Sequence, residues 1–118
     1  EAGYKIKHFR KELEKYGLEK PIWLTEIGCP GVRVRGRCSW WLGSCPDEMQ
    51  QAAFLRRVME FLSAQEGVEK IFWAFFQDTP NHFHNGVDYF GLIRKDYSKK
   101  PAYMEYQKII QEYSGEIQ

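Results

Sequence analysis

The sequence predicts an α/β fold in which short buried strands alternate with amphipathic helices. Two apolar runs of strand length lie at residues 22–24 and 71–76. Helical spacing of apolar residues precedes, separates and follows them, so the order is helix, strand, helix, strand, helix. Alternation of this kind implies parallel strands joined by right-handed crossovers.

The first helix is predicted by an apolar face that ends at a glycine. The residues of this face follow a spacing of three to four: Ile6, Phe9, Leu13 and Tyr16. Gly17 is a natural stop, because glycine adopts the left-handed conformation that ends many helices.

Two more helices are predicted by their apolar faces and by their first residues. Either Ser44 or Asp47 caps the second, with Gln50 placed as in a capping box, and Gly67 ends it. Pro101 opens the third. The inward residues of the second are Ala52, Leu55, Val58, Met59 and Leu62, and those of the third are Ala102, Tyr106, Ile109, Ile110 and Tyr113.

The first strand carries an ionisable side chain at its carboxyl end. Glu26 follows the apolar run, and Gly28 and Pro30 then break the strand. A buried strand gives no reason for a carboxylate at this position, although a solvated strand-end residue is the plainer alternative. The carboxyl ends of parallel strands are where α/β proteins place their chemistry, so Glu26 is the leading candidate for a functional residue.

Aromatic residues gather near the ends of the two predicted strands. They are Trp40, Trp41, Trp73, Phe75, Phe76, Phe83, Tyr89 and Phe90, in a chain that is 16% aromatic. Flat apolar rings suit sugars, whose C–H bonds pack on them while hydroxyl groups reach polar neighbours. Core packing beneath long loops is the alternative, and it accounts for some of these residues.

Composition and length constrain the class of protein. The net charge of +1 favours neither nucleic acid nor an anionic membrane as a partner, and no apolar stretch is long enough to span a bilayer. Two parallel strands cannot bury themselves, and a closed (β/α)8 barrel takes about 250 residues. The 118 residues are therefore expected to be the C-terminal piece of a longer protein.

Residues 20–28, with the sequence KPIWLTEIG, resemble the seventh strand of the large clan of retaining (β/α)8 glycoside hydrolases. That clan includes cellulases, mannanases, β-xylosidases and β-galactosidases. The strand with Phe72 and Trp73 resembles the eighth, and residues 90–93 and 100–103 resemble the lead into the last helix. The resemblance implies a TIM (β/α)8 barrel of which residues 1–118 form one C-terminal portion, from the sixth helix to the eighth.

The resemblance also implies roles for individual residues. Glu26 would be the catalytic nucleophile and Trp73 the aromatic floor under the sugar, with Trp40, Trp41 and Asp78 as further substrate-binding residues. The acid/base of the clan belongs to an Asn-Glu pair on the fourth strand, and no such pair occurs here. The chain thus carries half of a catalytic pair and is expected to be inactive alone, with no cofactor required.

Three cysteines lie in the loop after the first strand: Cys29, Cys38 and Cys45. They allow one disulfide with one thiol left over, which would indicate an oxidising, extracellular location or a hyperthermophile. A metal site that adds His82 and His84 is the alternative, but the spacing lacks the close pairs of zinc sites. The basic segment 33–37 is interpreted either as a hairpin arm or as a solvated loop.

Two functions remain open at this stage. The first is part of a retaining glycoside hydrolase that acts on a carbohydrate substrate. The second is a non-catalytic carbohydrate-binding or scaffold barrel, which an intact strand-end carboxylate at Glu26 makes less favoured. Exposed strand edges further predict self-association or association with the missing part of the barrel.

Overall fold

The computed structural model describes residues 2–40 and 43–117, and its elements follow the predicted order. A two-stranded hairpin and a 3-10 helix are added within the loops. The elements are α1 (Ala2–Lys15), β1 (Ile22–Ile27), β2 (Ser39–Trp40), β3 (Gly43–Ser44), α2 (Glu48–Ser63), β4 (Val68–Trp73), η1 (Gly86–Tyr89) and α3 (Pro101–Ile117).

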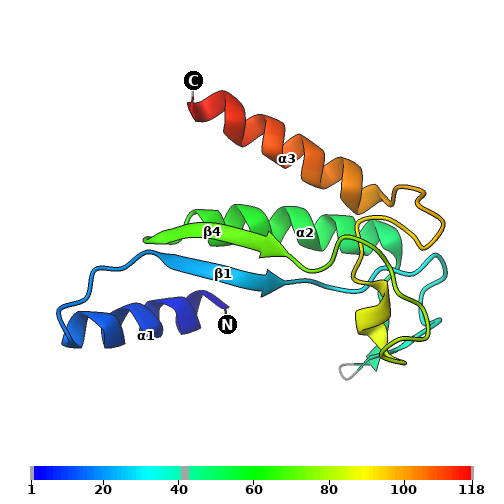
Figure 1. Ribbon diagram of the computed structural model, residues 1–118, viewed down its shortest axis with the longest axis horizontal. Helices are drawn as coiled ribbons and strands as arrows, with labels where there is room; N and C mark the ends of the chain where they lie inside the picture. Colours follow the sequence, from blue (N-terminus) through cyan, green and yellow to red (C-terminus); the bar gives the residue numbers. More distant parts are fainter. Residues whose placement is uncertain (1, 41–42, 118) are drawn as a thin grey trace.

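The two longer strands, β1 and β4, pair in parallel, as predicted. Their loops therefore gather at one end of the molecule, beyond the carboxyl ends of both strands (Figure 1). The hairpin of β2 and β3 lies among these loops, so the basic segment 33–37 forms a loop and not a strand arm.

Strand β4 ends earlier than the apolar run suggested. It begins at Val68 and ends at Trp73, which leaves Phe75 and Phe76 exposed in the following loop. The Phe75 N–H donates to the Phe90 carbonyl, so the backbone here bonds to the returning loop and no longer to β1.

The helix ends follow the sequence signals closely. Gly17 has φ +68°, and the N–H groups of Gly17 and Leu18 donate to the last turn of α1 in a Schellman arrangement. At α2 the cap is Asp47 rather than Ser44, because Asp47 and Gln50 exchange side-chain-to-backbone hydrogen bonds of 2.8 and 2.9 Å. Helix α2 ends at Ser63, a turn before the predicted stop at Gly67.

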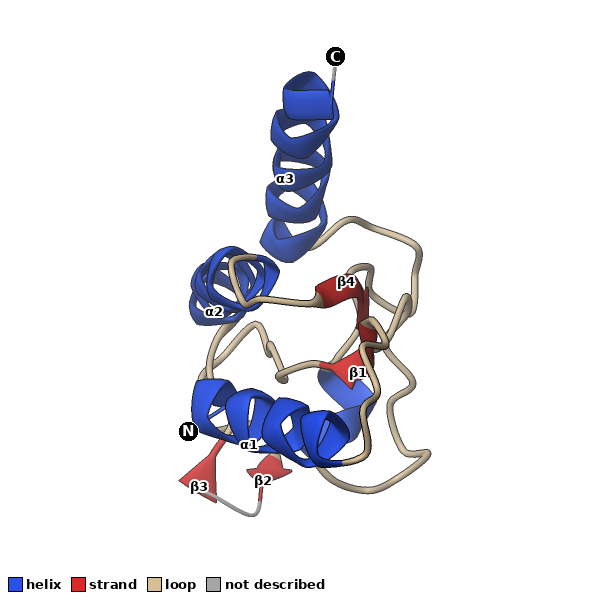
Figure 2. Cartoon of the chain, turned by 90° about the vertical axis from the view of Figure 1, so that its left-hand side faces the viewer, coloured by secondary structure: helices blue, strands red, loops and turns tan. Residues whose placement is uncertain are grey.

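One side of the strand pair packs against helices (Figure 2). Ile6 of α1, Ile22 of β1 and Leu62 of α2 form one buried cluster. A second cluster joins α2 to α3 and comprises Ala52, Leu55, Met59, Leu92, Ala102 and Ile109. These buried residues include most of the predicted inward positions of α2 and α3.

Three predicted inward residues are instead exposed: Phe9, Tyr16 and Ile110. A three-to-four spacing marks which side of a helix is apolar but not how much of that side another element covers. Ile6 of the α1 face is buried and Leu13 is half-buried, whereas Phe9 and Tyr16 remain in solvent.

The opposite face of the strand pair is open. Trp23 and Phe72 keep 51% and 46% of their surface exposed, and their rings lie 6.3 Å apart. The Lys70 ammonium group lies 4.5 Å from the centre of the Trp23 ring. Large exposed aromatics side by side on a sheet face are typical of a surface that another segment covers.

Candidate functional site

The carboxylate of Glu26 lies at the carboxyl end of β1, one residue before the strand ends. Leu24 and Ile27 both pack against the helix side, although three positions separate them, and the strand register is irregular between them. Between Leu24 and Ile27 the strand has one residue more than regular alternation requires. The side chains of Thr25 and Glu26 can therefore both lie away from the helices, and both residues are exposed. Glu26 is thus accessible at the mouth of the sheet.

Gly28 allows the loop after β1 to approach the loop after β4 closely. A Cβ atom at this position would lie 2.3 Å from the Ala74 carbonyl oxygen and 2.6 Å from the Phe90 ring. Any side chain would push the two loops apart. The glycine two residues after Glu26 therefore fixes how near the loop that carries Phe90 comes to the loop after β1.

The indole of Trp73 lies on the helix side of β4. Its ring is 6.3 Å from the Phe54 ring of α2, and its Nε1–H donates to the Phe90 carbonyl at 2.9 Å. Trp73 pairs with Ile27, and both pack against the cluster shared by α2 and α3. This is the place of a core residue and not of a platform beside Glu26, so we do not carry Trp73 forward as a sugar-binding residue.

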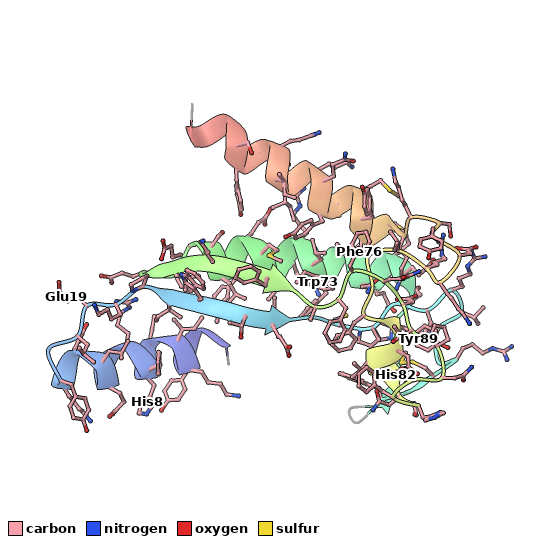
Figure 3. All side chains as sticks on the ribbon, in the orientation of Figure 1. His8, Glu19, Trp73, Phe76, His82 and Tyr89 are labelled. Atoms are coloured by element: carbon pink, nitrogen blue, oxygen red, sulfur yellow. A yellow bond between two sulfur atoms is a disulfide. The ribbon has the colours of Figure 1, made fainter. Side chains whose placement is uncertain are left out.

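Other aromatic side chains do reach the mouth. The Phe90 ring lies between Trp40 and Phe75, at centroid distances of 5.4 and 6.3 Å. These three residues, called here the Phe90 cluster, join β2 and both loops at the end that also contains Tyr89 and His82 (Figure 3). Trp41, the other tryptophan of the prediction, lies outside the described residues.

Asp78 is buried and forms an ion pair. The Lys100 Nζ donates to Asp78 Oδ1 at 3.0 Å, and the Gly91 N–H donates to the same oxygen at 2.8 Å. Burial raises the pKa of Asp78 and lowers the pKa of Lys100, while their mutual attraction opposes both changes. With its carboxylate engaged in this way, Asp78 serves to hold the loop after β4 and is poorly placed to meet a substrate.

A buried glutamine that the sequence analysis missed holds the two loops together. Gln51 of α2 is fully buried, and its Nε2 donates to the carbonyls of Cys29, Tyr89 and Gly91 at 3.0, 3.2 and 3.3 Å. The signal was present, because Gln51 lies one turn before Leu55 and is thus a polar residue on an apolar helix face.

Two of the three cysteines form a disulfide. Cys38 and Cys45 are bonded, with their Cα atoms 5.6 Å apart, and Cys29 is a free thiol. Burial raises the pKa of the Cys29 thiol to about 11. Within residues 2–40 and 43–117, no three His, Cys, Asp or Glu side chains lie together as a metal site would require.

The site thus combines an accessible strand-end carboxylate with an aromatic cluster in the loops at the same end of the strand pair. Residues 3–111 match the family model described as the glycosyl hydrolase catalytic core, and the chain belongs to this family. The predicted relationship to glycoside hydrolases is confirmed.

Solved structures show the same relationship. The chain is similar to a family 39 glycoside hydrolase from the gut symbiont Bacteroides cellulosilyticus WH2, with 29% identity and a TM-score of 0.54 over 70% of this chain and 14% of that one. It also shares its fold with a β-glucuronidase of Faecalibacterium prausnitzii, at 19% identity and a TM-score of 0.59, over 93% of this chain and 18% of that one. The chain therefore spans less than a fifth of either structure, and its mixed α/β fold fits a fragment of a glycosidase domain.

No curated protein matches the chain. No helix among the described residues is long and apolar enough to cross a membrane.

Proposed function

We propose that residues 1–118 form the C-terminal part of the (β/α)8 catalytic domain of a retaining glycoside hydrolase, with Glu26 as its nucleophile. The observation that carries the proposal is the exposed Glu26 carboxylate at the carboxyl end of a parallel strand, away from the helices. Enzymes of this architecture hold their catalytic groups at that end of the strands. Membership of the glycosyl hydrolase family supplies the class of reaction.

In this mechanism Glu26 attacks the anomeric carbon and forms a covalent glycosyl-enzyme intermediate. A second carboxyl group protonates the leaving oxygen and then removes a proton from the attacking water, and it must lie about 5–5.5 Å from the first. That group comes from another strand of the barrel, outside these 118 residues, so this chain alone does not hydrolyse glycosides. The open face with Trp23 and Phe72 is where the remaining strands and their side chains would pack.

The test is chemical rescue in the full-length protein that contains these residues. Glu26→Ala should lower the hydrolysis of activated aryl glycosides by about a thousandfold or more, because the nucleophile is gone. Azide should restore turnover and give a glycosyl azide of inverted anomeric configuration, since azide attacks from the face that the carboxylate occupied. The control is Glu19→Ala, because Glu19 is an exposed glutamate before the other end of β1 (Figure 3).

Two outcomes would contradict the assignment. One is that Glu26→Ala keeps more than about a tenth of the rate, which is a loss of less than ~1.4 kcal/mol of transition-state stabilisation. The other is a rescued product of retained configuration, which would make Glu26 the acid/base. A wild-type protein that binds sugars without hydrolysing any glycoside would favour the non-catalytic carbohydrate-binding module.

A further inference from the structure

A cavity of about 440 Å³ lies between the loop after β1 and the loop after β4. These loops meet beyond the carboxyl ends of the strands, next to the first residues of α2 and α3 (Figure 1). The cavity is thus at the same end of the sheet as Glu26. The residues that matter to the argument are Arg33, Arg37, Glu48, Tyr89, Arg94 and Lys95.

Some charges at this cavity neutralise each other. Arg94 forms a two-point contact with Glu48, with its Nε and Nη2 at 2.8 and 2.7 Å from the two carboxylate oxygens. A third nitrogen of Arg94 donates to the Ser98 hydroxyl at 3.0 Å. Asp78 is occupied by the buried Lys100. Glu48, Asp78 and Arg94 line the cavity, but their charges are neutralised within these ion pairs and are not available to a ligand.

Three further cations have no such partner. Arg33, Arg37 and Lys95 line the cavity, are exposed, and make no side-chain hydrogen bond or ion pair with any described residue. The remaining carboxylate is Asp96, which accepts hydrogen bonds from the N–H and hydroxyl of Ser98 and lies near Arg33. Positive charge therefore exceeds negative charge around the opening.

Residues with apolar groups also line the cavity. Among them are Tyr89, Pro80 and Val34. A ring face and small apolar groups suit the C–H side of a sugar ring, while guanidinium groups suit a planar carboxylate or a sulfate through paired hydrogen bonds. The two kinds of surface together fit a sugar that carries an acidic group.

We propose that this cavity is a subsite for the negatively charged residue of an acidic carbohydrate, with Arg33, Arg37 and Lys95 facing its carboxylate or sulfate. The carbohydrate nature of the ligand rests on the proposed function. The preference for an anion follows from the cavity itself. The glycoside hydrolase would accordingly act on chains that contain charged sugars.

Direct binding tests the subsite without hydrolysis. We would titrate the full-length Glu26→Gln variant with glucuronate, galacturonate, glucose 6-sulfate, glucose and galactose, and follow ligand signals by NMR at low ionic strength. At least one acidic sugar should bind five times or more tightly than its neutral counterpart, and added salt should reduce that difference.

Charge-removing variants locate the effect. Arg33→Gln and Lys95→Gln should each weaken binding of that acidic sugar about threefold or more and leave the neutral sugars unchanged. Arg35→Gln is the matched control, because it removes the same charge from the same loop, but Arg35 lines a different cavity with Cys29 and Phe54. It should change affinity less than twofold.

The proposal is overturned if acidic and neutral sugars bind equally, or if Arg35→Gln weakens binding as much as Arg33→Gln. Inorganic sulfate that binds as tightly as every acidic sugar would also overturn it, since the cavity would then be a plain anion site. Acidic sugars that bind as expected to a wild-type protein without glycosidase activity would refute the catalytic role of Glu26 and leave the subsite standing.

Discussion

Replacing Gln51 with leucine should destabilise the region that carries the candidate site. Gln51 is fully buried in α2, and its amide donates to carbonyls in the loop after β1 and in the loop after β4. Leucine keeps a similar volume but donates no hydrogen bond. The substitution therefore isolates the polar contribution of this side chain from its packing.

The size of the effect follows from what each carbonyl loses. Tyr89 O still accepts from the Gly31 N–H and from Lys100 Nζ, both at 2.9 Å, but no other described group donates to the carbonyls of Cys29 and Gly91. Two unsatisfied buried acceptors cost about 2–5 kcal/mol. Removing the Gln51 Oε1, which is buried without a partner, returns about 1–2 kcal/mol. Taking the middle of each range, the expected loss is about 2 kcal/mol.

Urea unfolding of the full-length protein, followed by tryptophan fluorescence, would measure this loss as a shift in midpoint. Gln107→Leu is the control, because Gln107 is exposed on α3 and should change the free energy of unfolding by less than about 0.5 kcal/mol. Gln51→Glu should be worse than Gln51→Leu at pH 7, since a carboxylate would face carbonyl oxygens, and should recover in acid. Equal effects of the two leucine variants would refute the reasoning.

Two further predictions concern ionisable groups near the same loops, the half-buried Cys29 and the fully buried Lys100. At pH 8 a thiol pKa of about 11 in place of the ordinary 9.0 lowers the thiolate fraction about 100-fold, so iodoacetamide should alkylate native Cys29 about 100-fold more slowly than the urea-unfolded protein. Equal rates would contradict the burial of Cys29. Because the pKa of this thiol is raised in the folded state, its contribution to the free energy of unfolding is full below about pH 9 and is lost as pH rises through 11. Lys100→Met should cost about 3–5 kcal/mol at pH 7, because it leaves the Asp78 carboxylate buried and unpaired. The penalty should shrink as pH falls and Asp78 is protonated. Replacing both partners, as in Lys100→Met/Asp78→Leu, should raise the thermal midpoint above that of Lys100→Met. A double variant whose midpoint is no higher would show that an unpaired Asp78 carboxylate is not the cause of the loss.

Local signals in the sequence were sufficient for the element order and for several element ends. The Asp47 capping box and the Gly17 stop each depend on backbone groups within a few residues, so neighbours in sequence determine them. The parallel pairing of β1 and β4 followed from the helix between them, because a crossover of that kind brings the chain back in the same direction.

Contacts between distant segments were harder to predict. The apolar run at residues 71–76 gave no sign that β4 ends at Trp73, because the end depends on a hydrogen bond between Phe75 and Phe90. The side on which Trp73 points depends on the strand register, and a shift of one residue would reverse it. The pairing of Cys38 with Cys45 likewise needed the fold, since three cysteines allow three single disulfides.

Several buried polar contacts join the loops after β1 and β4 to α2 and to each other, in addition to the Phe90 cluster. Gln51 and Lys100 both donate to the carbonyl of Tyr89, and Asp78 accepts from Lys100 and from the Gly91 N–H. Apolar packing would require these loops to close over a core, which would fill the space that a ligand needs. Hydrogen bonds fix the direction of each backbone segment while the surface above stays concave and polar. The mouth of the strands can therefore hold its shape and remain open, whereas the helix side takes its stability from packing.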